Sequence, residues 1–442
     1  MEYLSSGKIL IVDLASSETR EEELDEGLIS KRIGGAGINN YLYNSYKDYD
    51  PIVLGAGILT GTLYPASDLS VLTARSPVTD NVCHCPVTLK AGIEFKYCGF
   101  DYLVVLGASA KPVFLWIHDG VADISDGSGV WGKDVWQTTD AWRRDMGDDL
   151  IQTLVIGKAG ETGSDLAQVS VNYWGSGDVW GFASIFGKKR LKGIAMRGMG
   201  LLEIEDPEGF VEESMRLLES VKTGPWKGRS GLYDLLVSLG KNDVADWVAP
   251  LVHRNSASYN VPYAGNTFVY LDEDPSLLKE PQGAEPGLLL TSPYGLIAAK
   301  DMGLSAMDAC RLIRSCLRYG IDPEMVALIA SRDAKKRRED IESSMDSLER
   351  KGMKPWRPPF SPMVPRQPVF ADFGVEGEPG QLEQWWLQRQ ALAYVFGIDP
   401  LFLIMSPELT AQSMIEAVRI GSGIEISEET LDGLVSEICG CN

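Results

Sequence analysis

The stretch that decides the fold is residues 172–198, NYWGSGDVWGFASIFGKKRLKGIAMRG, in which glycines precede a dense group of cations. Glycine lets a backbone approach a ligand closely, and successive free N–H groups can cradle an anion. The stretch therefore predicts either a cradle for a phosphorylated cofactor or a glycine-rich turn followed by a strand with a solvated basic edge. On the residues alone we favour the turn. The cations are Lys188, Lys189, Arg190, Lys192 and Arg197.

The rest of the chain contrasts with this basic stretch, because the formal net charge over 442 residues is −21. Binding to nucleic acid or to an anionic membrane surface needs clustered positive charge, so the composition argues against both partners. Residues 1–12 lack the pattern of a signal peptide, and no run is long and apolar enough to span a bilayer. We therefore expect a cytoplasmic protein with chain enough for two or three domains.

Seven cysteines and three histidines limit the metal chemistry that the sequence allows. An odd number of cysteines in a large acidic chain indicates reduced thiols. Cys83-His84-Cys85 has the residue types of a metal site, but neighbours at i and i+2 rarely chelate one tetrahedral ion without further ligands. We expect inert, buried thiols there, and a frayed terminus at Cys439 and Cys441.

Short β-branched and aromatic runs separated by glycine turns dominate the first two hundred residues, whereas helical patterns dominate after Asp206-Pro207. The class predicted is α+β, with a β-rich domain at residues 1–204 and an all-α region at residues 205–442. We find no convincing internal repeat. Strands are expected at 8–14, 51–56, 69–74, 102–106, 112–117 and 152–156. Helices are expected at 33–46, 133–146, 207–221, 306–319, 323–351, 381–396, 407–420 and 427–438, with an irregular connection at 354–380.

Seven segments between residues 32 and 198 follow one another in the order found in one known family. They are Arg32-Ile-Gly-Gly-Ala-Gly37, Leu59-Thr-Gly-Thr62, Arg75-Ser-Pro-Val-Thr79, Glu94-Phe-Lys-Tyr-Cys-Gly-Phe-Asp101, Val130-Trp-Gly-Lys-Asp-Val-Trp136, Ile156-Gly-Lys-Ala-Gly-Glu161 and Phe186-Gly-Lys-Lys-Arg-Leu-Lys-Gly-Ile-Ala-Met-Arg-Gly198. The chain thus resembles the tungsten-containing aldehyde:ferredoxin oxidoreductase family, which includes a benzoyl-CoA reductase catalytic subunit. The resemblance implies two similar β-sheet halves that form a base for two pterin dithiolenes.

This chain departs from the family where the family holds its pterins. The resemblance implies an arginine in the strand before Arg75, at the position of Leu69. In the glycine-rich loop, Val179 replaces an arginine and Trp180 replaces a glycine, so bulk is added and positive charge is lost. If a pterin is retained, the resemblance places it at Gly181, Ala183, Gly187 and Lys189.

The cluster ligands of the family are also missing. Its Cys-x-x-Cys-x-x-x-Cys motif has its counterpart at Ser258, Val261 and Gly265, which offer none of the thiolates that a four-iron cluster needs. An Asp-x-x-Gly-Leu-Cys motif, which carries the fourth cysteine, aligns with residues 394–399 and ends here at Asp399. We align a second such motif, ending in aspartate, with residues 292–297, where both carboxylates are lost.

These departures predict a degenerate, shortened homologue that is a non-catalytic structural or docking partner in an anaerobic redox complex. We expect no cofactor, no catalytic residue and no metal ligand. The expected partner is an active paralogue or a second copy of the chain, with a ferredoxin-type carrier reached through that partner. Two alternatives stay open. One is an active tungsten or molybdenum bis-pterin oxidoreductase acting on an aldehyde or a related carbonyl, and the other is a small-ligand binding module that uses the emptied cleft.

Overall fold

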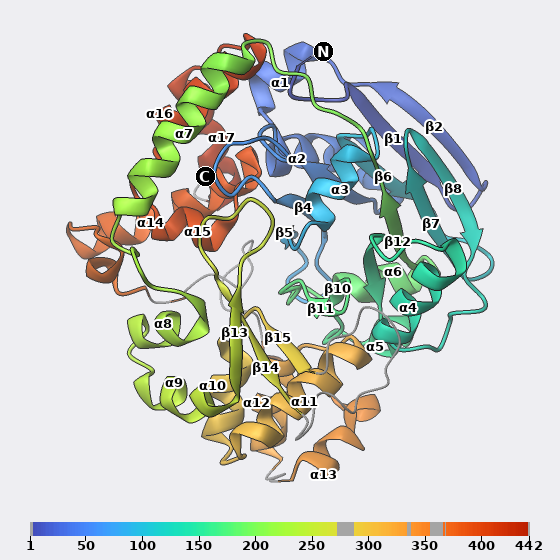
Figure 1. The fold of residues 1–442 in the computed structure, drawn as a ribbon. Coiled ribbons are helices and arrows are strands. Elements are labelled where there is room, and N and C mark those ends of the chain that lie inside the picture. Colours follow the sequence, from blue (N-terminus) through green and yellow to red (C-terminus); the bar gives the residue numbers. More distant parts are fainter. Residues whose placement is uncertain (1–2, 272–286, 334–336, 354–365, 367, 441–442) are drawn as a thin grey trace.

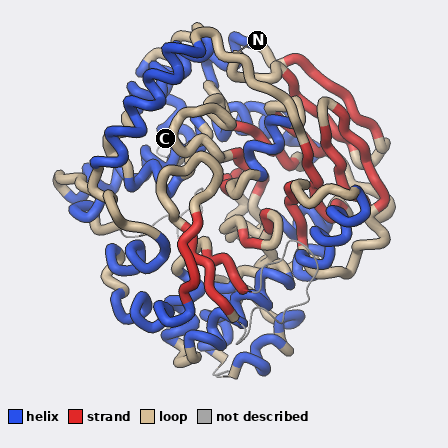
Figure 2. The backbone as a smooth tube through the Cα atoms, viewed as in Figure 1, coloured by secondary structure: helices blue, strands red, loops and turns tan. Residues whose placement is uncertain are grey.

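The computed structural model describes residues 3–271, 287–333, 337–353, 366 and 368–440. Two mixed sheets form a β-rich base on one side of the molecule, and helices from the second half of the chain cover the other side (Figure 1, Figure 2). The last strand of the base ends at Arg197, and the first long helix after it begins at Pro207. The predicted α+β class, with two sheet halves followed by helices, is confirmed.

The first sheet has the strand order β2-β1-β6-β3-β4-β5. Its strands β1 and β6 run parallel, and every other neighbouring pair is antiparallel. β3 and β6 are buried along their whole length, as expected for strands covered on both faces. The strands are β1 Lys8–Asp13, β2 Glu18–Glu23, β3 Ile52–Ala56, β4 Ser70–Arg75, β5 Val82–Val87 and β6 Tyr102–Leu106.

The second sheet repeats this arrangement strand for strand, with the order β8-β7-β12-β9-β10-β11. Here β7 and β12 form the parallel pair. The base is therefore an internal repeat of topology, which the sequence did not reveal because only the folding pattern recurs. The strands are β7 Val113–His118, β8 Val121–Asp126, β9 Gln152–Ile156, β10 Val169–Val171, β11 Trp174–Gly175 and β12 Leu191–Arg197.

Short helices connect the strands of the base. One of them, α6, lies inside the basic stretch, where the sequence analysis expected only a loop before a strand. Asp134 caps α4 by accepting a hydrogen bond from the backbone N–H of Gln137, and the Gln137 side chain closes a capping box. The helices are α1 Glu26–Arg32, α2 Gly35–Ser45, α3 Ala91–Tyr97, α4 Val135–Met146, α5 Lys158–Glu161 and α6 Phe182–Lys188.

The helices of the second half pack on the base and share its cores. One core joins the first sheet to α14 and its neighbours, and another joins the two sheets to α11 and α12. Most predicted helices are confirmed to within a few residues. They are α7 Pro207–Thr223, α8 Gly231–Ser238, α9 Asn242–Val248, α10 Tyr294–Asp301, α11 Ala306–Tyr319, α12 Pro323–Arg332, α13 Arg338–Glu342, α14 Pro379–Phe396, α15 Pro400–Met405, α16 Ala411–Ser422 and α17 Glu428–Cys439.

Two expectations for this region need correction. It is not purely helical, because β13 Val252–Ser256, β14 Asn266–Tyr270 and β15 Gly287–Leu290 form a three-stranded antiparallel sheet. The helix expected at 323–351 ends at Arg332, and a separate short helix ends at Glu342, before Ser343 and Ser344, whose hydroxyls bond to the backbone instead. Most of the irregular connection expected at 354–380 lies outside the described residues.

Candidate functional site

The tetrapeptide Gly-Ile-Asp-Pro occurs twice, at residues 320–323 and 397–400. In each copy the glycine ends a helix at positive φ, 75° at Gly320 and 85° at Gly397, which is a conformation that favours glycine. The aspartate then caps the next helix: Asp322 accepts a hydrogen bond from Glu324 N, and Asp399 accepts one from Phe402 N. The repeat therefore joins α11 to α12 and α14 to α15 in the same way.

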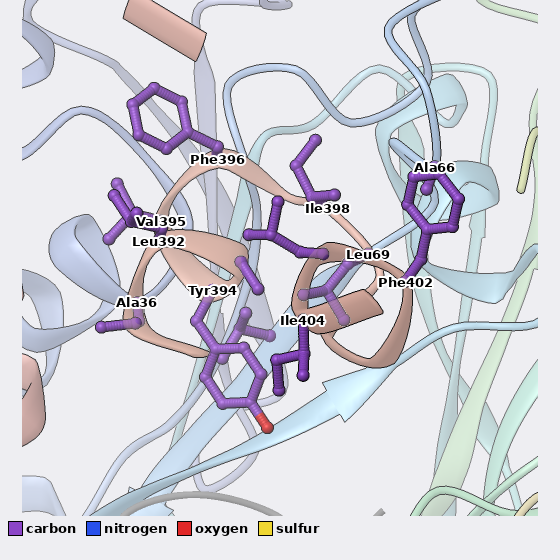
Figure 3. Packing of buried hydrophobic residues seen from close by; sticks show 14 of the residues in the cluster. Ala36, Ala66, Leu69, Leu392, Tyr394, Val395, Phe396, Ile398, Phe402 and Ile404 are labelled. Carbon is purple, nitrogen blue, oxygen red and sulfur yellow. The ribbon is translucent and has the colours of Figure 1, made fainter. Parts of the chain in front are cut away.

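One copy docks on the first half of the base. Leu69 N donates to the carbonyl of Gly397 at 3.1 Å, and Asp399 N donates to the carbonyl of Ala66 at 2.8 Å. A Cβ added to Gly57 would lie 2.2 Å from Gly397 N, so the two backbones touch. We term residues 57–69 together with 396–399 the first seam. Figure 3 shows the apolar side chains around Leu69 that fill it.

The other copy docks on the second half in the same manner. Gln168 N donates to the carbonyl of Gly320 at 3.0 Å, and Asp322 N donates to the carbonyl of Leu166 at 3.0 Å. A Cβ on Gly157 would lie 2.2 Å from the carbonyl oxygen of Tyr319. We term residues 157–168 together with 319–322 the second seam. The two seams are equivalent positions in the two halves of the base.

This equivalence corrects one alignment made from the sequence. The counterpart of residues 397–399 is residues 320–322, because both segments make the same backbone bonds to the base. This equivalence favours residues 317–322 over residues 292–297 as the counterpart of the second family motif. An aspartate, Asp322, is retained at its last position, and Leu317 stands where the resemblance implies the first.

A cavity of about 40 Å³ lies beside the first seam. Its lining includes Ser258, Val261, Gly265 and Asp399, which are the four positions that the resemblance assigns to the cluster ligands. These positions come from two distant parts of the sequence, and the structure brings them to one cavity. The resemblance therefore implies that this cavity corresponds to the family's cluster site.

The residues around this cavity do not fit an iron–sulfur cluster, which needs thiolate ligands. The cysteines that the structure describes are free thiols elsewhere in the fold. Burial raises the pKa of Cys83 and of Cys310 to about 12, which keeps both protonated. Between residues 3 and 440, leaving the undescribed segments aside, no three histidine, cysteine, aspartate or glutamate side chains gather closely enough to hold a metal ion.

A second cavity, of about 50 Å³, lies beside the second seam. Asp178 and Asp322 both line it. Burial raises the pKa of Asp178 to about 6, although backbone N–H groups, including those of Val169 and Trp180, stabilise its charged form. Burial, reinforced by the nearby carboxylate of Glu324, raises the pKa of Asp322 to about 7. Both cavities are far smaller than the roughly 300–1,000 Å³ of ordinary cofactor sites.

The residues proposed for a retained pterin lie in packed parts of the second half. Gly181 precedes α6 at a φ of 76°, and Ala183 is buried within that helix. A Cβ on Gly187 would lie 2.0 Å from the carbonyl oxygen of Gly160, and Lys189 Nζ donates to the carbonyl of Gly107 at 3.1 Å. Neither cavity is lined by these four residues. Their role in pterin binding stays a prediction.

Three cations of the basic stretch form ion pairs or hydrogen bonds with other groups of this chain. Lys192 is fully buried and forms an ion pair with Glu161. Arg197 binds both Asp148, at 2.7 Å, and Glu94, at 3.2 Å. Lys189 bonds to carbonyl groups, as described above. The stretch is thus mainly part of the base and its charge balance.

Trp180 fills space where the resemblance implies a glycine. Its side chain is fully buried, and its indole N–H donates to the carbonyl of His84 at 2.8 Å. His84 lies in β5, where its Nδ1 is 2.9 Å from Thr73 Oγ1. Burial lowers the pKa of His84 to about 3, so the ring is neutral at physiological pH.

Comparisons with known proteins relate the two-sheet base to one family. Residues 9–198 match the model of the aldehyde ferredoxin oxidoreductase N-terminal domain. The chain is 32% identical over 232 residues to the tungsten-containing aldehyde ferredoxin oxidoreductase of Pyrococcus abyssi, a match that spans 50% of this chain and 38% of that protein. Residues 9–198 therefore form an N-terminal domain of the aldehyde ferredoxin oxidoreductase type, as the resemblance predicted.

Two further similarities are informative. Over 239 residues the chain is 26% identical to the WOR-like subunit of an aliphatic sulfonate oxidoreductase of Pyrococcus furiosus, covering 37% of that subunit. A chain of the active site complex BamBC of benzoyl-coenzyme A reductase superposes with a TM-score of 0.77 at 15% identity, covering 99% of this chain and 88% of that chain. The chain therefore matches well under half the length of these sequence relatives, while the fold similarity extends over nearly all of it. Among the described helices, none combines the length and the hydropathy needed to cross a membrane.

Proposed function

We propose that the chain is a subunit of the aldehyde ferredoxin oxidoreductase family that carries no tungstopterin or iron–sulfur cluster of its own and serves as a structural or docking partner in a redox complex. The observation that carries this proposal is the first-seam cavity. Its four cluster-ligand counterparts supply two oxygen-bearing side chains, a valine and a glycine, in about 40 Å³.

The packing of the base supports the same proposal. Leu69 and Trp180 occupy pterin-side positions of the family, and both side chains are fully buried against this chain's own residues. The small volumes of the two seam cavities argue against a pterin or another large ligand at either seam. The aspartate retained at Asp322 is accounted for as a helix cap.

The expectation of a protein partner rests on similar proteins. One relative is named as a subunit, and the similar solved structure is named as a complex. The domain division at residue 204 and the place of the chain in anaerobic metabolism belong to the same proposal.

The experiment that tests the proposal is metal and pterin analysis of the full chain purified without oxygen. We expect tungsten, molybdenum and iron well below one atom per chain, and no extractable pterin. A colourless protein agrees with this expectation. One tungsten or molybdenum atom per chain, with pterin, would overturn the proposal.

A further inference from the structure

The first-seam cavity gathers oxygen donors where the family has sulfur donors. Asp399, which precedes α15, and Ser258, which follows β13, both line it. Carboxylate and hydroxyl oxygens are hard ligands, which suit cations such as Ca²⁺ and Mg²⁺ rather than iron–sulfur clusters.

A second carboxylate lies directly beside this pair. Asp68 is fully buried, and its Oδ2 accepts a hydrogen bond from Ser258 Oγ. The backbone N–H groups of Asp68 and Asp399 both donate to the carbonyl of Ala66, at 2.9 Å and 2.8 Å, so one turn holds the two residues together. Burial raises the pKa of both Asp68 and Asp399, and the nearby carboxylate of Asp399 raises the pKa of Asp68 further.

Nothing in the described part of the chain balances these two negative charges. No lysine, arginine or histidine there forms an ion pair with Asp68 or Asp399. The Oδ1 atom of Asp68 is buried without a hydrogen-bond partner among the described residues. Buried carboxylates normally take a proton or a cation when no side chain neutralises them.

A further polar group that lacks a partner among the described residues belongs to Tyr263, a residue of the cavity lining. Tyr263 lines the cavity, its side chain is more than nine-tenths buried, and its hydroxyl has no hydrogen-bond partner in the described residues. Further oxygen-bearing side chains in the lining are Thr88, Asn266 and Thr291. A buried hydroxyl that makes no hydrogen bond costs about 1–3 kcal/mol, which a bound ion or its water could recover.

We propose that this cavity binds one divalent hard cation of the calcium type through Asp399, Asp68 and Ser258. Two carboxylates match the charge of a divalent ion. About 40 Å³ leaves room for one ion with few waters, and calcium tolerates an irregular set of carboxylate, hydroxyl and amide oxygens better than magnesium does. The site differs from a carboxylate cage, because hydroxyl and amide oxygens complete the shell.

The second seam supplies the matched negative case. Asp322 occupies the position equivalent to Asp399, but its carboxylate lies near the buried guanidinium of Arg350, which favours its charged form. A guanidinium thus lies near Asp322, whereas no such cation among the described residues acts on Asp399, and we expect no metal ion at the second seam.

Terbium luminescence tests the proposal, because Tb³⁺ replaces Ca²⁺ at oxygen sites and emits when a nearby aromatic side chain is excited. Tyr263 lines the cavity, and the Trp226 ring lies 5.4 Å from the Tyr263 ring. Titrating Tb³⁺ into the chelator-treated full chain should give saturable emission with one site per chain. Calcium should displace it at lower concentration than magnesium or sodium.

Variants locate the ion. Asp399→Asn should weaken Tb³⁺ binding at least tenfold, while its amide still caps α15. Ser258→Ala should weaken binding less. Asp322→Asn is the control and should leave the affinity unchanged. Emission that does not saturate, equal affinity in Asp399→Asn and the unmodified chain, or displacement by sodium as effectively as by calcium would each overturn the proposal. Tb³⁺ emission is independent of the proposed docking role, which is tested by the tungsten, molybdenum, iron and pterin content.

Discussion

The first and second seams contain the same tetrapeptide and form equivalent pairs of backbone hydrogen bonds, yet different side chains lie beside them. In the first seam Asp399 lies near a second carboxylate, Asp68, and a group of hydroxyls. In the second seam Asp322 lies near the guanidinium of Arg350. Since the repeated residues do the docking in both, the residues outside the repeat decide what each seam can bind.

The largest expected effect comes from restoring the arginine that the family has at Leu69. The Leu69 side chain is fully buried in the first seam, so Leu69→Arg would bury a charge with no partner provided for it. We expect a loss of about 3–5 kcal/mol in the free energy of unfolding, measured by chemical denaturation. Leu69→Met is the control and should cost far less. An arginine tolerated as well as methionine would show that the first seam retains room and charge for an anionic group.

The next largest loss of stability is expected from substitution of the glycines in the two seams. A Cβ at Gly397 would lie 2.0 Å from Thr60 Oγ1, and one at Gly320 would lie 2.6 Å from Gly157 N, both at positive φ. Gly397→Ala and Gly320→Ala should each cost more than about 2 kcal/mol in the free energy of unfolding. Gly303→Ala isolates the backbone term, because Gly303 has a φ of 86° and nothing within 4 Å; it should cost about 1 kcal/mol. Equal losses at all three positions would contradict close docking.

A pH-dependent effect should distinguish the second seam. The pKa of Asp322 is raised from 3.8 to about 7, so between these values the folded state keeps a proton that the unfolded state releases. The contribution of Asp322 to stability is therefore fully present below about pH 4 and is lost as the pH rises to 7. Asparagine caps the helix but does not titrate.

The measurement is the free energy of unfolding of the unmodified chain relative to Asp322→Asn, followed from pH 4 to pH 8. We expect the relative stability of the unmodified chain to fall by on the order of 4 kcal/mol. Ser305→Asn, which replaces a cap without a carboxyl group, controls for the exchange and should give a flat difference. A difference that rises with pH for Asp322→Asn would mean that Arg350 depresses the pKa of Asp322 instead.

Much of the base could be predicted from the sequence. Strands such as β6 and β9 are short apolar runs between turns, and their predicted bounds agree with the structure. The docking role of the two Gly-Ile-Asp-Pro segments cannot be inferred from the sequence, because it depends on backbone hydrogen bonds to distant segments. β13 was missed because its residues, Val-His-Arg-Asn-Ser, are mostly polar and exposed.

The candidate site also contains residues that the sequence predicts and one that only the fold reveals. The alignment identified Ser258, Val261, Gly265 and Asp399 as a set, and the structure brings them to one cavity. Asp68 carried no signal in the sequence, since a single aspartate before a strand is ordinary. Only the fold brings it to Asp399, through the shared carbonyl of Ala66. Burial and charge balance of this kind depend on contacts between distant segments and cannot be inferred from spacing.

The proposed loss of the family's cofactor chemistry from the first seam can be tested directly. The most direct measurement is the tungsten, molybdenum and iron content of the full chain purified without oxygen, together with its visible absorption spectrum. We expect all three metals well below one atom per chain and no absorption from an iron–sulfur cluster. Near four iron atoms per chain with such absorption, or one tungsten atom with pterin, would contradict it.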